Sequence, residues 1–232
     1  MKIYEKYSGE YSKSALFRGI APQDIVSMLY CLQPRISGYR KNEIVINAGE
    51  RLDSIGMVLS GEAVVIKENS AGNRNMMMLL GPGELFGETV AFAGSPRWPA
   101  TVQALTACDI MFIPIGKIVG ECEKMCSWHR GLISNMLRII AERALMLNKK
   151  VEYLAIRSMR GKLSAYLLDE YKRAGTATFS LSLKRNGLAD FLNVSRPSMS
   201  REMSRMRDEG VIDFHLSAIM IKDLDGLKRM LE

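Results

Sequence analysis

The stretch VSRPSMSREMSRM, residues 194–206, combines arginines and serines with regularly spaced methionines. If this stretch is helical, Met199, Met203 and Met206 fall at i, i+4 and i+7 and form one buried face. The opposite face then presents side chains that donate hydrogen bonds to DNA phosphates and to base edges. Its members are Arg196, Ser200, Arg201, Ser204 and Arg205. We therefore expect this helix to recognise DNA; an ordinary solvated helix face is the alternative.

The residues around Asn193 predict how that helix is positioned. A short helix before it carries Ala189, whose small side chain lets the second helix lie close. Asn193 tolerates the left-handed backbone of a tight turn, Ser195 can cap the second helix, and Pro197 suits its first turn. The inward-facing apolar residues of the first helix are Leu188, Phe191 and Leu192. This pattern is typical of a helix-turn-helix, and the residues expected to contact DNA are Ser195, Arg196, Ser198, Ser200, Arg201 and Arg205.

Two further elements flank the helix-turn-helix. Before it, Ser158 to Gly161 is a candidate hinge, followed by a helix over residues 162–174. After it, residues 210–222 predict a β-hairpin with the strands VIDFH and IMIKD and the tip LSA. A hairpin in this place makes a winged helix-turn-helix.

A long helix is predicted from Trp128 to Met159, because its apolar residues follow an unbroken 4,3 alternation. A repeat that averages 3.5 residues keeps a narrow apolar stripe facing a partner helix, as in a coiled coil. We call this stripe the seam; its residues are Ile133, Leu137, Ile140, Ala144, Leu147, Val151 and Leu154. A parallel homodimer joined along the seam is expected, and an amphipathic helix on the core of its own chain is the alternative.

Ahead of the long helix, from Gly38 to about Pro114, short β-rich runs alternate with Gly, Asn and Pro. Many short strands at close spacing predict a barrel or roll, whose interior often holds a ligand. Small helices are expected from Leu16 to Leu32, interrupted by Pro22. The long helix follows the roll directly, so a change in the roll can reach the seam.

Composition limits the remaining classes of function. With 232 residues, 47% of them hydrophobic, the chain can form one large or two modest domains. Its net charge of +7 suits a polyanionic partner without requiring one. The N-terminus lacks the apolar core of a signal peptide and no apolar run could span a membrane, so we expect a cytoplasmic protein with reduced thiols and no membrane partner. Only His129 and His215 are present and no catalytic motif is recognisable, so no enzyme activity is expected.

Three elements in the same order give the chain a resemblance to the CRP/FNR family of bacterial transcription regulators. They are the roll segments LFRGI, YRKNEIVINAGE, IGMVLSGEAVV and GELFGET, the helix ending LAIRSMRGKL, and the element VSRPSMSREMSRM. The resemblance implies an α+β fold, with a double-stranded, jelly-roll-like β-roll in a sensor domain over residues 1–126, a dimerisation helix over 127–159 and a winged helix-turn-helix domain over 160–232. It also implies a homodimer on double-stranded DNA with an inverted-repeat site, half-sites about 34 Å apart, and RNA polymerase as a partner if the protein is an activator.

Within the DNA-reading element, Arg196 and Arg201 match family arginines that read guanine or grip phosphate. Many members have a glutamate between them that accepts a hydrogen bond from a base amino group, and Pro197 stands there instead. Proline has no side-chain acceptor. The DNA sequence preferred by other members is therefore not assumed, and Ser198 and Ser200 are candidates to take part.

The roll departs from the cyclic-AMP-binding members of the family. In those members a Gly-Glu motif binds the ribose hydroxyl, and an Arg and a hydroxyl residue further along bind the cyclic phosphate. Gly87, Glu88 and Thr89 match the start of this motif. Ten residues after Glu88, where the phosphate-binding pair belongs, stand Trp98 and Pro99.

Arg97 lies one residue early, and in a strand an offset of one residue turns a side chain to the other face unless a bulge intervenes. Leu147 and Asn148 replace the residues of the long helix that contact the base in cyclic-AMP-binding members. We therefore expect a different effector. Trp98 offers a flat apolar face and Glu88 a negative charge, which suit a small organic compound such as an aromatic one. Two alternatives stay open: Trp98 fills the roll and no small molecule binds, or the protein responds to a cyclic nucleotide.

The four cysteines offer one further alternative. Cys122, Cys126 and His129 are spaced by four and three residues, which would align them on one helical face as a redox or metal site. A small apolar cysteine face packed against the roll is the simpler interpretation, and no metal ligands are assigned. Members with an oxygen-sensing iron–sulfur cluster carry closely spaced N-terminal cysteines, whereas Cys31 stands alone there, and no motif indicates haem.

Overall fold

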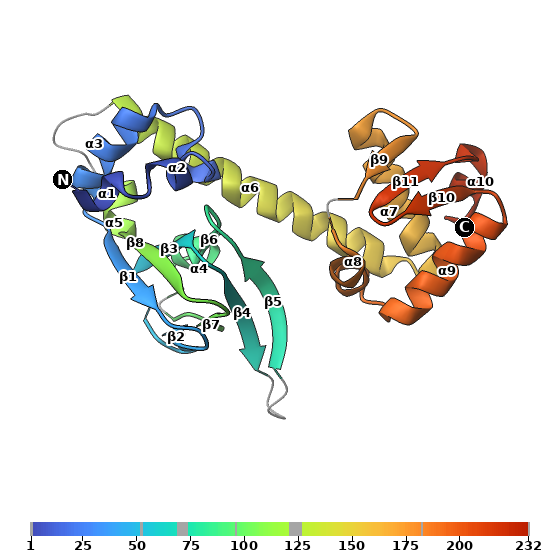
Figure 1. Cartoon of the computed structure of the whole chain (residues 1–232), viewed down its shortest axis with the longest axis horizontal. Helices are drawn as coiled ribbons and strands as arrows, with labels where there is room; N and C mark the ends of the chain where they lie inside the picture. The colour runs from blue at the N-terminus through green and yellow to red at the C-terminus, as the bar shows by residue number, and fades with distance from the viewer. Residues whose placement is uncertain are drawn as a thin grey trace. The chain divides into compact units, whose positions relative to one another are not determined.

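The computed structural model of the chain describes residues 2–51, 53–68, 74–95, 97–120, 127–181 and 183–231. It consists of two compact units, Met1–Glu142 and Arg143–Glu232, and the boundary between them falls inside the long helix (Figure 1). The division into segments 1–126, 127–159 and 160–232 stays a prediction. In the described part of the chain, no helix combines the length and apolar character needed to cross a membrane.

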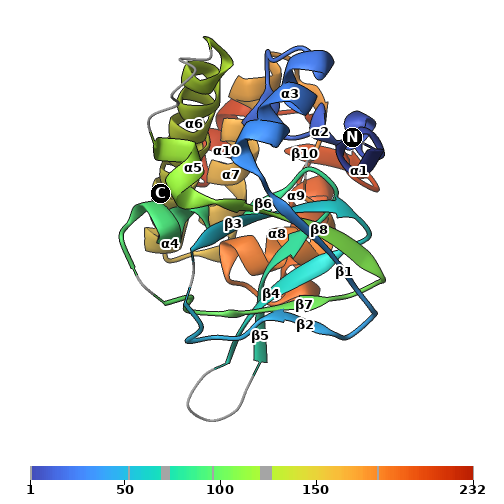
Figure 2. The same cartoon turned by 90° about the vertical axis from the view of Figure 1, so that its left-hand side faces the viewer.

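The first unit contains the β-roll, built from two antiparallel sheets and covered by helices (Figure 2). Its helices are α1 (Lys2–Glu5), α2 (Ser8–Tyr11), the short 3-10 helix η1 (Ala15–Phe17), α3 (Pro22–Leu32), α4 (Glu88–Phe92), α5 (Ile115–Val119) and the first part of α6 (Ser127–Ala155). One sheet, in the order β1-β8-β3-β6, is formed by β1 (Arg35–Tyr39), β8 (Cys108–Pro114), β3 (Ser54–Ser60) and β6 (Leu85–Phe86). The other, in the order β2-β7-β4-β5, is formed by β2 (Ile44–Ile46), β7 (Thr101–Ala104), β4 (Ala63–Glu68) and β5 (Arg74–Leu80). The roll expected from the sequence is confirmed.

Strands β3 and β8 separate two apolar cores. Successive side chains of a strand point to opposite faces. Met111 and Ile113 of β8 therefore join the core under the helices, whereas Phe112 faces the inside of the roll. A Cβ atom at Gly56 of β3 would lie 2.0 Å from the Phe86 ring, so only glycine lets that ring pack directly on the strand.

The N-terminal helices and the first part of α6 form the core on the outer side of this sheet. Leu132 and Met136 of α6 are buried there. Asn135, also buried, donates from Nδ2 to the carbonyl oxygens of Leu16 and Arg18 at 3.0 and 2.8 Å. A buried amide has to find such partners. These two bonds fix the first part of α6 to the segment around η1.

The second unit is a winged helix-turn-helix domain. It contains the rest of α6, α7 (Met159–Ala174), α8 (Arg185–Leu192), α9 (Arg196–Asp208), α10 (Leu224–Arg229) and a sheet in the order β10-β11-β9, from β9 (Thr178–Ser180), β10 (Ile212–His215) and β11 (Ala218–Ile221). The predicted hairpin is confirmed as β10 and β11. Its tip, Leu216 and Ser217, places Leu216 in the left-handed region at φ 52°. Strand β9 is an addition that the sequence analysis did not predict.

The long helix ends earlier than expected, at Ala155 instead of Met159. Ser158 is the N-cap of the next helix, and its hydroxyl accepts a hydrogen bond from the backbone N–H of Gly161 at 2.9 Å. Serine is one of the best N-caps, so helix α7 begins at Met159 and not at residue 162. The helical break therefore covers residues 156–158, so of the predicted hinge from Ser158 to Gly161 only Ser158 lies in the break.

The last turn of α6 is anchored in the second unit by an aromatic cluster. The buried Tyr153 ring lies 5.9 Å from the ring of Tyr166 in α7 and 5.8 Å from that of Phe191 in α8, both edge to face. The Tyr153 hydroxyl donates to Asp169 at 2.9 Å, and burial followed by this hydrogen bond raises the pKa of Tyr153. Edge-to-face pairs add about 0.5–1.5 kcal/mol each to the burial of their area. The end of α6 is thus part of the core of the second unit.

Candidate nucleic-acid interface

Helices α8 and α9 form the expected helix-turn-helix. Asn193 follows α8 with φ 52°, the left-handed conformation predicted for the turn. Ser195 is the N-cap of α9, where its hydroxyl accepts from the backbone N–H of Ser198 at 3.3 Å. Pro197 lies in the first turn, where its missing N–H leaves no helical bond unmade. Helix α9 therefore begins at Arg196, directly after the predicted cap Ser195.

One face of α9 packs into the core of the second unit and the other faces solvent. Met199, Met203 and Met206 are at most 1% exposed and pack with apolar residues of α7 and α8. Fully burying a side chain of this size contributes about 1.5–3 kcal/mol. On the other face, the exposed residues are Ser195, Arg196, Ser200, Arg201 and Arg205, and the half-buried residues are Ser198 and Ser204. The structure therefore brings all six predicted DNA contacts onto one helix.

Hydrogen bonds organise the start of this face. The Ser195 hydroxyl donates to Ser198 Oγ at 2.7 Å, and Arg201 Nη2 donates to the same oxygen at 3.2 Å. Ser198 therefore restrains the Arg201 guanidinium before any partner is bound. A side chain that is already ordered loses less conformational entropy when it binds.

Glu202, a carboxylate that the sequence analysis did not single out, lies behind this face. Its side chain is 9% exposed, and it accepts from Arg160 Nε at 2.5 Å and from Arg205 Nη1 at 3.3 Å. Arg160 also forms two bonds of 2.8 Å to Glu209, and the hydrogen bonds to Glu209 and then Glu202 raise the pKa of its guanidinium. The sequence does hold a signal for Glu202: it lies three residues after Met199 and four before Met206, on the buried face of the helix, where a charge needs a partner.

The seam of α6 is largely uncovered in the single chain. The exposed seam residues are Leu137, Ala144, Leu147, Val151 and Leu154, and the half-buried ones are Ile133 and Ile140. Leu137 and Leu147 each expose 64% of their surface. Leu145 and Met146 lie outside the 4,3 alternation and are also exposed.

The residues expected to bind an effector are divided between the two units. Leu147 and Asn148 are exposed on the part of α6 that belongs to the second unit. In the roll, Gly87 precedes α4 in the left-handed conformation at φ 88°, and Glu88 after it is fully buried. The hydroxyl of Thr89 donates to the Glu88 carboxylate at 2.7 Å. Gly87, Glu88 and Thr89, which match the start of the cyclic-AMP-binding motif, are therefore ordered by contacts within the roll itself.

Trp98 and Arg97 occupy different environments. Trp98 is 6% exposed in the core of the roll, with its ring 6.3 Å from that of Phe86. Its indole Nε1 has no hydrogen-bond partner among the residues that the structure describes. Arg97 is exposed and donates from Nη1 to the Gly49 carbonyl at 2.9 Å. The offset predicted from the sequence thus leaves Arg97 at the surface and Trp98 inside.

The cysteine alternative falls mostly outside the described residues, because Cys122 and Cys126 lie there. His129 is buried, with Nε2 2.8 Å from the carbonyl oxygen of Ile118. Among described residues, no three His, Cys, Asp or Glu side chains are grouped so that they could hold a metal ion. Burial raises the pKa of the Cys108 thiol, which keeps that cysteine protonated and unreactive.

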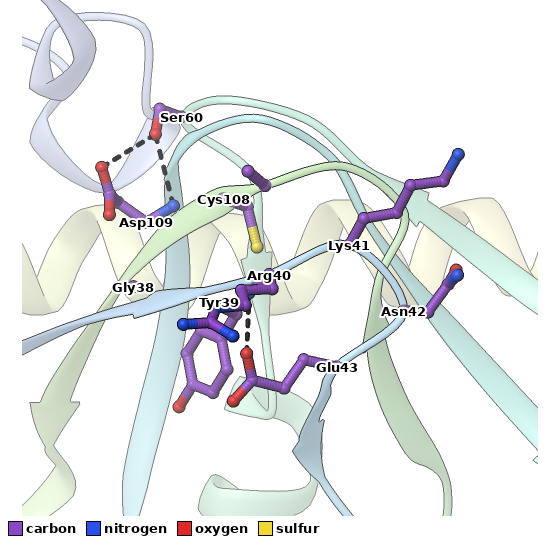
Figure 3. Close-up of a pocket in the computed structure, with 10 residues that line it drawn as sticks. Gly38, Tyr39, Arg40, Lys41, Asn42, Glu43, Ser60, Cys108 and Asp109 are labelled. Carbon is purple, nitrogen blue, oxygen red and sulfur yellow. Dashed lines mark hydrogen bonds between the residues drawn. The ribbon is translucent and has the colours of Figure 1, made fainter.

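An open depression lies at one end of the roll (Figure 3). It has a volume of about 820 Å³ and is lined by residues 38–43, Ser60 and residues 107–109. Its carboxylates already have partners: Asp109 accepts from the hydroxyls of Tyr7 and Ser60 at 2.7 and 3.1 Å, and Glu43 accepts from a backbone N–H at 2.7 Å. None of the predicted effector residues lines this depression.

A β-roll, a long helix and a winged helix-turn-helix with exposed arginines define a transcription regulator that binds DNA. Two family models match the chain, the cyclic nucleotide-binding domain over residues 37–124 and the Crp-like helix-turn-helix domain over residues 161–230. The chain belongs to the CRP/FNR family. Members of this family are transcription regulators and not enzymes.

Known proteins resemble the chain over most of its length. The CRP-like cAMP-activated global transcriptional regulator of Mycobacterium tuberculosis is 24% identical over 226 residues, covering 94% of this chain and 96% of the relative. A CooA mutant from Carboxydothermus hydrogenoformans gives a TM-score of 0.60 at 17% identity, covering 90% of both chains. The c-di-GMP-responsive regulator CLP of Xanthomonas campestris gives 0.56 at 17% identity, covering 86% of this chain and 98% of that one. At such identities the structural likeness establishes the fold alone.

Replacing Ser195 with Ala removes the N-cap of α9 and leaves the backbone N–H of Ser198 without its acceptor. We expect the free energy of unfolding to fall by about 1 kcal/mol, measured by urea denaturation followed by circular dichroism. Ser200→Ala is the control, because Ser200 is exposed within the helix, where alanine is a better helix former. Equal losses in the two variants would contradict the capping role.

Proposed function

We propose that this regulator is a homodimer that binds an inverted-repeat DNA site, with α9 of each protomer in a major groove. The observation that carries the proposal is the division of α9 into a buried methionine face and a solvent-facing arginine and serine face. Arginine can form two hydrogen bonds to guanine O6 and N7, and both residue types bind phosphate oxygens. The residues proposed to contact DNA are Ser195, Arg196, Ser198, Ser200, Arg201 and Arg205.

The exposure of the seam supports a dimer joined through α6. In the single chain, Leu137 and Leu147 leave 64% of their surface in water and Val151 leaves 61%. Exposing such an apolar stripe to water is unfavourable, and a second helix with an apolar stripe of the same repeat would bury it. The 4,3 spacing is matched by a parallel copy of the same helix. A second copy of this chain is therefore the proposed occupant of the seam.

The symmetry of the dimer determines the form of the DNA site. A two-fold axis presents two identical α9 helices, so the bound sequence has to be an inverted repeat with half-sites about 34 Å apart. The net charge of +7 favours association with a polyanion. We place the protein in the bacterial cytoplasm, where its DNA target lies, with RNA polymerase as a further partner if it activates transcription.

The roll is the proposed sensor, with a small organic effector other than cyclic AMP. Relatives include a protein described as cAMP-activated, but here Trp98 and Pro99 stand at the phosphate-binding positions and Arg97 is bonded to the Gly49 carbonyl. A ligand acceptor in the roll would satisfy the buried Nε1 of Trp98. Such an effector would favour the arrangement of the two α6 helices to which it binds more tightly. The shift in the equilibrium cannot exceed the difference between its binding free energies for the two arrangements.

Leu147→Lys should place a charge from each protomer in the seam and dissociate the dimer, with loss of specific DNA binding. Leu145→Lys is the matched control, because Leu145 is 65% exposed on the same helix but outside the 4,3 alternation. Analytical ultracentrifugation and binding to a selected operator measure both effects. The model of coupling through α6 is wrong if Leu147→Lys stays dimeric and binds as before.

Arg201→Ala should weaken binding to the selected operator by about 1–3 kcal/mol and relax specificity at one base position. Lys228→Ala, which removes a positive charge from α10, is the control and should preserve the sequence preference. Operator selection from a random DNA library, followed by titration of single-base variants, measures the change. A uniform loss on all sequences would reduce Arg201 to a phosphate contact.

A titration of Trp98 fluorescence against a metabolite library tests the effector pocket. In a Trp128→Phe background Trp98 is the remaining tryptophan, and a bound effector should change its emission by altering the environment of the buried indole. Trp98→Phe should abolish the response. A library in which no member, cyclic nucleotides included, changes the emission would count against the pocket.

A further inference from the structure

The Glu202 carboxylate, on the inner side of α9, accepts hydrogen bonds from two arginines. Its Oε1 accepts from Arg160 Nε at 2.5 Å, and its Oε2 accepts from Arg205 Nη1 at 3.3 Å. The Glu202 side chain is only 9% exposed. A carboxylate so far from water needs a positively charged partner, because its lost hydration is otherwise uncompensated.

Arg160 is the firmer of the two partners. It lies in the first turn of α7, and its Nη1 and Nη2 form a fork onto the two oxygens of Glu209, each at 2.8 Å. Bidentate, charge-assisted bonds of this kind are stronger and better oriented than single ones. Arg160 therefore contacts two carboxylates at once, Glu202 in α9 and Glu209 at the C-cap of that helix.

Arg205 is held much less firmly. Its side chain is 69% exposed, and its bond to Glu202 is 3.3 Å long, beyond the usual range of about 2.7–3.2 Å. Arg205 lies one turn after Arg201 on the face proposed to meet DNA. Its guanidinium can therefore bind either the Glu202 carboxylate on the inner side of α9 or a DNA phosphate on the solvent side.

We infer that Arg160 is a positioning residue, which supplies the buried Glu202 with a cationic partner and so releases Arg205 to bind a DNA phosphate. The inference rests on the proposed role of α9 in DNA binding. Without the Arg160 guanidinium, Arg205 becomes the cation that has to satisfy the buried Glu202, and it is kept from the DNA. Glu209, the C-cap of the same helix, then also loses its arginine partner.

The salt dependence of DNA affinity reports how many phosphates are bound and therefore follows Arg205. The logarithm of the binding constant falls with the logarithm of salt concentration with a slope of about −0.9 per phosphate. In the full-length dimer, Arg160→Gln and Arg205→Ala should each reduce the size of this slope by about 2, one contact per protomer. Together they should reduce it no further. Affinity for operator and for unrelated DNA should fall by the same factor, since phosphate contacts carry no sequence information.

Glu202→Gln supplies the rescue. In Arg160→Gln/Glu202→Gln the neutral amide no longer retains Arg205, so the slope should return to the wild-type value. Arg160→Met, with an apolar chain of similar length, replaces Arg160→Gln if the latter fails to fold. Arg173→Gln is the matched control, because it breaks an ion pair with Glu170 at the other end of α7 and should leave the slope unchanged.

An unchanged slope in the folded Arg160 variant, or a reduced slope that Glu202→Gln does not restore, would overturn the inference and leave Arg160 with a structural role. Thermal unfolding midpoints of every variant separate these results from loss of the fold. A wild-type protein whose DNA affinity does not depend on salt would instead contradict the proposed function.

Discussion

The burial of one face of α9 is the contact on which the proposed DNA-binding surface depends. Met199, Met203 and Met206 fill the core with unbranched, adaptable side chains and carry no group that needs a hydrogen bond. Once they are buried, Arg196, Arg201 and Arg205 on the opposite face of the helix are left exposed to solvent. The same packing removes Glu202 from water and makes its arginine partners necessary. One apolar contact therefore determines both the exposed arginines and the ion pairs behind them.

Helix α6 belongs to both units, so it links the roll, which is the proposed sensor, to the helix-turn-helix domain. Its first part is buried beside the roll and fixed by Asn135, whereas its last turn is fixed in the second unit by Tyr153. The exposed seam residues lie on the same helix. Any change in the roll that moves α6 thus acts on the element that carries the proposed dimer contact and the attachment of the DNA-binding domain.

Local and periodic signals made much of the fold predictable. The left-handed Asn193, the Ser195 cap and the methionine spacing act within a few residues, and the structure confirms each of them. The end of α6 was missed because apolar residues continue past Ala155, while the cap formed by Ser158 starts a new helix. The Arg160–Glu202 pair joins residues far apart in the chain, and no local pattern in a single sequence indicates such a pairing.

Because Tyr153 is attached to α7 and α8, the number of residues in α6 before it determines the direction in which its side chain leaves the helix. In an α-helix each residue adds about 100° of rotation and about 1.5 Å of rise. A single residue inserted between Glu142 and Tyr153 would therefore rotate Tyr153 about the axis of α6 by more than a quarter of a circle, whereas seven would restore its direction to within about 20°. The number of residues in this stretch therefore matters as well as their identity.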